Sequence, residues 1–143
     1  IMMGPETAAH HDLIIRFGGP LAWSQHLNSA GMGAGLASVR IHESPELPRL
    51  QGKLRENLAL FDSLIGTEQS GDDFSIRMVV IGSEAAAADA SGKIFERGFY
   101  TSPVFFPIVE RGKAGLRVML RADNRPEDIR TFCELVRDAV ELD

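Results

Sequence analysis

Arg117 is the residue whose type and position point most directly to chemistry. It lies in a segment where apolar residues alternate with others, with Leu116 before it and Val118 after it. Such alternation predicts a half-buried strand, and a charged residue within it most often faces solvent. A guanidinium that points into a cleft instead can bind a carboxylate through two parallel hydrogen bonds. The residues alone leave both orientations open.

Other residues of reactive type have simpler interpretations. Cys133 lies on an apolar helical stripe, which predicts a buried thiol rather than a nucleophile. Ser24 lacks the flanking glycines of a hydrolase nucleophile elbow, so taken alone it is a loop serine. The four histidines do not have the spacing of a tetrahedral metal site. They are His10, His11, His26 and His42.

A run of glycines at positions 31, 33 and 35 superficially resembles a phosphate-binding loop. The dinucleotide-binding pattern needs a preceding strand and a following acidic residue about 20 positions later, and this sequence supplies neither. The run instead predicts a helix whose bare backbone packs closely against a neighbour. Such a helix would be weak in isolation, since each interior glycine costs about 1 kcal/mol relative to alanine.

Composition restricts the class of protein that carries these residues. The 143 residues include 44% hydrophobic ones and have a formal net charge of −5. That balance excludes a disordered chain and argues against partners such as nucleic acid or an anionic membrane. No apolar run approaches the roughly 20 residues that span a bilayer, and one cysteine allows no internal disulfide. We expect a reduced, cytoplasmic protein with no nucleic-acid or membrane partner.

The periodicity of apolar residues predicts alternating helices and strands. The expected helices span residues 6–17, 28–42, 44–65, 83–98 and 124–140. The expected strands span residues 74–81, 99–105 and 115–120. From residue 44 onward the order is helix, strand, helix, strand, strand, helix. This order predicts an α+β fold in which helices cover a small antiparallel sheet.

Local signals mark where three of these helices begin. Ser44 with Pro45 is a favourable start, Ser83 is a good N-cap, and Asn124 with Glu127 resembles a capping box. The apolar stripes of the three helices are expected to form the core. They are Leu47, Leu50, Leu54, Leu58, Phe61 and Ile65; then Ala87, Ala90 and Ile94; then Ile129, Phe132, Cys133, Val136, Ala139 and Val140.

The segment from Val104 to Arg117, VFFPIVERGKAGLR, resembles the Pro-x-Val-Pro-x-Gly-x-x-x-Leu-Arg segment of the α-oxoamine synthases. These are pyridoxal 5'-phosphate (PLP) enzymes of the aspartate-aminotransferase fold. Within the family the segment is most similar to that of glycine C-acetyltransferase, which has a similar aromatic pair before the proline. Residues 18–24, 44–65 and 125–129 extend the resemblance over nearly the whole chain.

The resemblance implies the C-terminal fragment of a PLP-dependent acyl-CoA:amino acid C-acyltransferase. Residues 1–43 would form the C-terminal edge of the large domain and a connecting helix, and residues 44–143 the small C-terminal domain. Arg117 would bind the substrate carboxylate, while Ser24 and Gln25 would reach the cofactor phosphate. The implied partners are an amino acid, an acyl-CoA and a second copy of the chain in a homodimer.

The family's cofactor lysine has no counterpart among the three lysines of this chain, Lys53, Lys93 and Lys113. By resemblance it would lie shortly before Ile1. We therefore expect the parent protein to use PLP as an electron sink, and this chain alone to be inactive without a covalently bound cofactor. Two alternatives remain open at this stage, a fragment of a PLP-dependent aminotransferase and a ferredoxin-like ligand-binding module.

Overall fold

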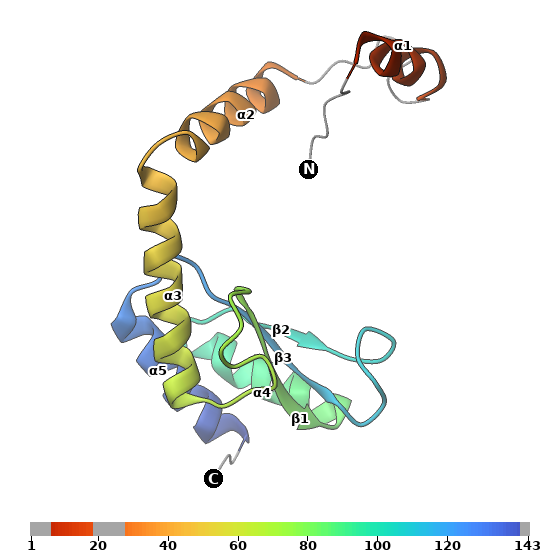
Figure 1. The fold of residues 1–143 in the computed structure, drawn as a ribbon. Helices are drawn as coiled ribbons and strands as arrows, with labels where there is room; N and C mark the ends of the chain where they lie inside the picture. The colour runs from red at the N-terminus through yellow and green to blue at the C-terminus, as the bar shows by residue number, and fades with distance from the viewer. Residues whose placement is uncertain (1–6, 19–27, 141–143) are drawn as a thin grey trace. The chain divides into compact units, whose positions relative to one another are not determined.

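The computed structural model describes residues 7–18 and 28–140, and its contacts divide the chain into two units, Ile1–Pro45 and Glu46–Asp143. The first contains two helices, α1 (Ala8–Phe17) and α2 (Ser29–His42), both close to their expected bounds (Figure 1). Neither helix has a buried residue.

Helix α2 begins at an N-cap of the kind that its sequence favours. The Asn28 Oδ1 atom accepts a hydrogen bond from the Gly31 N–H at 2.7 Å. Apart from the backbone of the helix itself and the adjoining residues, no atom lies within 4 Å of the place where a Cβ would stand on Gly33 or Gly35. The close neighbour that these glycines led us to expect therefore stays a prediction.

The second unit has the expected order of elements. They are α3 (Glu46–Leu64), β1 (Ile76–Gly82), α4 (Glu84–Glu96), β2 (Ser102–Val104), β3 (Ala114–Met119) and α5 (Pro126–Val140). The three strands form an antiparallel sheet in the order β1-β3-β2, with α3, α4 and α5 beside it (Figure 1). The prediction of an α+β fold with an antiparallel sheet is confirmed.

The core lies between one face of the sheet and the three helices. It joins Val79 of β1 and Leu116 of β3 to the apolar stripes of α3, α4 and α5. Ala87, Ala90 and Ile94 are all buried, as expected for α4. The α3 stripe is buried only toward its C-terminal end, because its first turns extend beyond the sheet (Figure 1). Among the described residues, no helix combines the length and apolarity needed to cross a bilayer.

The strand expected at residues 99–105 is much shorter in the structure. Only Ser102–Val104 pairs with β3, and Pro103 at its centre has no N–H to donate to a neighbouring strand. The chain turns directly afterwards, where the Ile108 N–H donates to the Phe105 carbonyl at 2.9 Å. Alternation identified the strand correctly but overestimated its length.

Asn124 does not form the expected capping box. Its Oδ1 atom accepts a hydrogen bond from the Arg121 N–H at 2.7 Å, so it closes the turn before α5 instead. The buried Asn57 of α3 holds the same turn, since its Nδ2 donates to the carbonyl oxygens of Arg121 at 2.8 Å and Asn124 at 3.1 Å. These long-range bonds to the turn are not visible in the local pattern.

Candidate functional site

Arg117 lies in the middle strand of the sheet and points away from the core. In the β1–β3 register it stands opposite Met78, and in the β2–β3 register opposite Ser102. Its neighbours Leu116 and Val118 are buried against the helices, whereas Arg117 is exposed. The alternation of the strand therefore places its guanidinium on the sheet face opposite the helices, which we call the open face.

The open face is otherwise mostly apolar. Ile76 and Val80 of β1 are each 43% exposed there, and Met119 of β3 is 61% exposed. Within the described part of the chain, the Arg117 guanidinium has no hydrogen bond or ion pair, and Arg117 is the only charged residue of the open face. A guanidinium without a partner on such a face is free to bind an anionic group.

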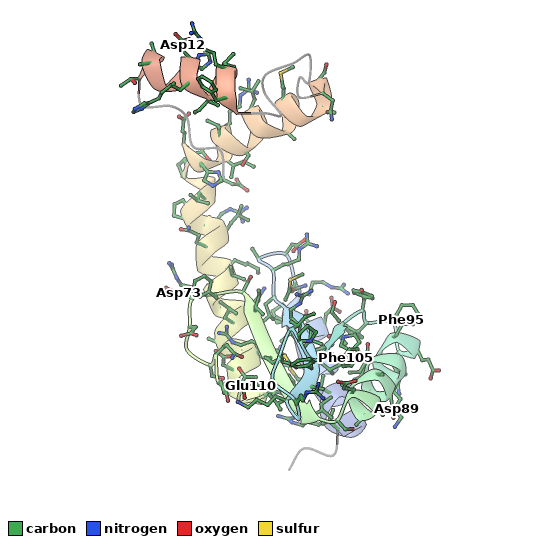
Figure 2. The ribbon with its side chains drawn as sticks, turned by 90° about the vertical axis from the view of Figure 1, so that its right-hand side faces the viewer. Asp12, Asp73, Asp89, Phe95, Phe105 and Glu110 are labelled. Atoms are coloured by element: carbon green, nitrogen blue, oxygen red, sulfur yellow. The ribbon has the colours of Figure 1, made fainter. Side chains whose placement is uncertain are left out.

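Arg117 lines an open hollow of about 570 Å³, which we call the Arg117 hollow. This volume lies within the range of about 300–1,000 Å³ typical of small-molecule sites. The sheet forms its floor, and its walls come from the loop after α3 and from the turn between β2 and β3. Figure 2 labels Phe105 and Glu110 in that turn. The lining residues from the two walls are Glu68, Gln69, Phe106, Pro107, Ile108, Val109, Glu110 and Lys113.

The turn between β2 and β3 places further charges around the hollow. Lys113 Nζ lies 3.0 Å from Glu110 Oε2, and this hydrogen-bonded carboxylate raises the pKa of Lys113. The Arg111 guanidinium stacks over the Phe106 ring at 4.5 Å from its centroid, a cation–π contact. Lys113 is therefore paired with Glu110, Glu68 adds a second carboxylate to the wall, and Arg117 is the cation of the hollow that has no partner among the described residues.

Buried polar contacts fix the backbone at Arg117. The Thr101 hydroxyl donates to the Arg117 carbonyl at 3.2 Å, and the Ser91 hydroxyl of α4 donates to the Thr101 carbonyl at 3.1 Å. Thr101 is only 6% exposed. Sequence reasoning missed these two contacts. The only signals in the sequence were a serine within a helix and a threonine just before a short strand, and neither indicates its partner.

The described residues do not fit a covalent PLP anchor. A lysine that forms a Schiff base needs a lowered pKa, but Glu110 raises that of Lys113, and the Lys93 ammonium lies 2.8 Å from Asp89. Lys53 is exposed on α3. Ser24 and Gln25, the expected contacts to the cofactor phosphate, lie outside the described residues.

The remaining candidates for chemistry among the described residues are Cys133 and possible metal ligands. Cys133 is fully buried, and desolvation raises the pKa of its thiol to about 11, which confirms the structural interpretation. Among residues 7–18 and 28–140, no cluster of histidine, cysteine or acidic side chains could hold a metal ion.

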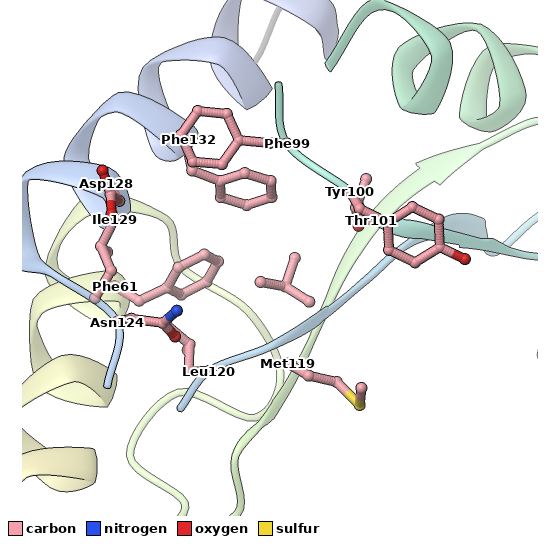
Figure 3. Close-up of a pocket in the computed structure, with 11 residues that line it drawn as sticks. Phe61, Phe99, Tyr100, Thr101, Met119, Leu120, Asn124, Asp128, Ile129 and Phe132 are labelled. Carbon is pink, nitrogen blue, oxygen red and sulfur yellow. The ribbon is translucent and has the colours of Figure 1, made fainter. Parts of the chain in front are cut away.

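A second, smaller pocket of about 130 Å³ lies between α3, α5 and the ends of two strands (Figure 3). Aromatic rings dominate its wall, with the Phe99 and Phe132 centroids 5.7 Å apart. Its one carboxylate, Asp128, is already paired with Arg125 at 2.9 Å. The Arg117 hollow, which is larger and has an unpaired charge, is the better candidate.

The chain is similar in sequence to one group of enzymes. It is 33% identical over 114 residues to 8-amino-7-oxononanoate synthase of Petrotoga mobilis, and 31% identical over 136 residues to that of Methylocella silvestris. These alignments cover 77% and 95% of this chain but only 28% and 38% of the relatives, so the chain spans about a third of their length. No protein-family model matches the chain.

Solved structures of related enzymes share the fold. The 8-amino-7-oxononanoate synthase of Francisella tularensis superposes with a TM-score of 0.73 at 21% identity, over 94% of this chain and 40% of that one. Serine palmitoyltransferase from S. paucimobilis superposes with a TM-score of 0.76 at 17% identity, over 93% and 34%. The fold matches the C-terminal domain of the aminotransferase-like PLP enzymes, which confirms the expected fold class.

Proposed function

Because its homologues are PLP-dependent α-oxoamine synthases and it matches their C-terminal part, we propose that this chain supplies the substrate-carboxylate site of an acyl-CoA:amino acid C-acyltransferase. The relatives are 8-amino-7-oxononanoate synthases and serine palmitoyltransferase, so the likeness to glycine C-acetyltransferase in particular stays a prediction.

One observation carries the proposal. Arg117 is a cation without a partner among the described residues, on an apolar face, at the floor of a hollow of about 570 Å³. A guanidinium binds a carboxylate through two parallel hydrogen bonds, which add geometric specificity as well as affinity. The substrate group that fits is the α-carboxylate of an amino acid.

The proposed partners follow from the names of the relatives. Serine palmitoyltransferase is named for an amino acid and an acyl group, which favours acyl transfer over an aminotransferase reaction. For this protein we propose that the substrates are an amino acid and an acyl-CoA. We also propose that the full-length protein is a cytoplasmic homodimer. When bound, PLP would supply an electron sink for the amino acid. The described residues hold no anchor for it, so their proposed role is to bind and orient the substrate.

The proposal predicts that Arg117→Ala raises the KM for the amino acid. The measurement is steady-state kinetics of the full-length protein with glycine, alanine or serine and acetyl-, hexanoyl- or palmitoyl-CoA. Hydrogen bonds to charged groups are worth about 1.5–3 kcal/mol, so the expected increase is about 10- to 100-fold. Arg117→Lys is expected to restore only part of the affinity, since an ammonium cannot form the two parallel bonds.

Arg130→Ala is the matched control, because Arg130 is an exposed arginine of α5 that does not line the hollow. It should leave the KM for both substrates unchanged. An amino-acid KM that stays at the wild-type value in a folded Arg117→Ala protein would remove Arg117 from the site and overturn the proposal.

A further inference from the structure

Gln69 belongs to the same hollow as Arg117 and is held in place by the sheet. Its Oε1 atom accepts a hydrogen bond from the Met78 N–H at 3.0 Å. Met78 is the β1 residue that stands opposite Arg117, and β1 is an edge strand. Gln69 therefore lies on the side of β1 away from β3, half-buried and in the wall of the Arg117 hollow.

The bond to Met78 fixes the orientation of the Gln69 amide. A backbone N–H can only donate, so the amide oxygen must face Met78 and the NH₂ group must face the other way. Within the described residues this NH₂ group has no hydrogen-bond partner. Besides the Lys113 ammonium, which is paired with Glu110, the hollow thus contains two sets of side-chain donors, the guanidinium of Arg117 and the NH₂ group of Gln69.

A buried ion pair holds the loop that carries Gln69. Asp62 of α3 accepts hydrogen bonds from Arg77 Nε at 2.7 Å and Nη2 at 2.9 Å, and from the Gly71 N–H at 3.0 Å. Arg77 Nη2 also donates to the Asp72 carbonyl at 3.0 Å. The Arg77 side chain is fully buried. A loop attached to the core in this way presents Gln69 in a defined position, as a binding residue requires.

We propose that Gln69 is a binding residue for the acyl donor, with its NH₂ group donating to an amide carbonyl oxygen in the long arm of the acyl-CoA. This inference rests on the proposed function. Adjacent strands lie about 4.8 Å apart, so a group beyond β1 is about 10 Å from β3. A small amino acid with its carboxylate on Arg117 does not reach that far, and neither does the thioester carbonyl, which must lie against the amino acid to react with it. The long arm of the acyl-CoA does reach that far.

The test uses Gln69→Glu and Gln69→Met in the full-length protein, with the amino acid and acyl-CoA pair that the wild type uses fastest. Glutamate keeps an acceptor for the Met78 N–H but has no NH₂ group, and methionine has neither. Both variants should raise the KM for the acyl-CoA about three- to tenfold, the usual effect of one lost hydrogen bond. The KM for the amino acid should stay within about twofold of the wild-type value.

Two further measurements separate a binding role from a structural one. Hydrogen exchange at the Met78 amide should stay slow in Gln69→Glu and become fast in Gln69→Met. Ser63→Glu, at an exposed position of α3 outside the hollow, adds the same charge and should change neither KM. High salt should leave the Gln69→Glu effect in place, because salt screens charge repulsion and not the loss of a donor.

The outcomes distinguish this inference from the proposed function. Unchanged acyl-CoA KM values in both Gln69 variants, or an increase confined to the amino-acid KM, overturn the inference while Arg117→Ala still supports the function. An unchanged amino-acid KM in Arg117→Ala overturns the proposed function and this inference together.

Discussion

At the scale of single residues, the Asp62–Arg77 pair is the most buried ion pair among the described residues. The side chains are 14% and 0% exposed. The hydrogen bond from Arg77 is the main cause that lowers the pKa of Asp62, with burial acting in the opposite direction. Removing one partner of such a pair leaves the charge of the other buried and uncompensated, which costs about 3–5 kcal/mol.

We expect Asp62→Asn to lower the free energy of unfolding by an amount in that range, measured by urea denaturation at pH 7. Because the folded pKa of Asp62 is below its usual 3.8, its contribution is present above that pH and is lost as the pH falls through the folded value. The difference between wild type and variant should therefore shrink in acid.

Asp73→Asn is the matched control. Asp73 pairs with Arg55 at 3.4 Å, but the two side chains are 82% and 61% exposed, so solvent weakens the pair. Little change in stability is expected. Equal losses in the Asp62 and Asp73 variants would contradict the assigned role of the buried pair.

At the scale of elements, two glycines of the second unit are expected to respond in opposite directions to alanine. A Cβ on Gly115 of β3 would stand 2.0 Å from the Val79 carbonyl oxygen of β1, so Gly115→Ala must push the two strands apart. On Gly92 of α4 a Cβ meets nothing within 4 Å. Gly92→Ala should stabilise the helix by about 0.5–1 kcal/mol.

Thermal unfolding monitored by circular dichroism measures both changes. A change of 1 kcal/mol shifts the Tm by about 4–8 °C for a domain of this size, so the two variants should move to opposite sides of the wild type. A Gly115→Ala protein with an unchanged Tm would show that β1 and β3 can move apart with no loss of stability.

At the scale of the whole chain, we predict that residues 44–143 fold without residues 1–43. All the described core residues lie within this segment, and α1 and α2 have no buried residue. The measurement is urea unfolding of residues 44–143 beside the 143-residue chain. The midpoints should agree, and a shortened chain that unfolds without a cooperative transition would show that its core is incomplete.

Sequence periodicity was a good guide wherever a single face of an element decides its structure. The α4 stripe of Ala87, Ala90 and Ile94 and the alternation around Arg117 are both of this kind. Two of the missed contacts join residues of different elements, nine and 64 positions apart. Asn57 donates to a turn 64 residues later. Gln69, in the loop after α3, accepts from the Met78 N–H at the free edge of β1. No local pattern encodes such a partner, so only the folded chain reveals it.

The two edges of the small sheet also affect how the protein behaves at high concentration. Exposed strand edges invite pairing between molecules, which begins aggregation. On β2 the edge is three residues long and contains Pro103, which cannot donate to an added strand. On β1 the Gln69 amide already occupies the Met78 N–H. The same side chain that we place in substrate binding therefore also blocks a strand from another molecule from joining the sheet.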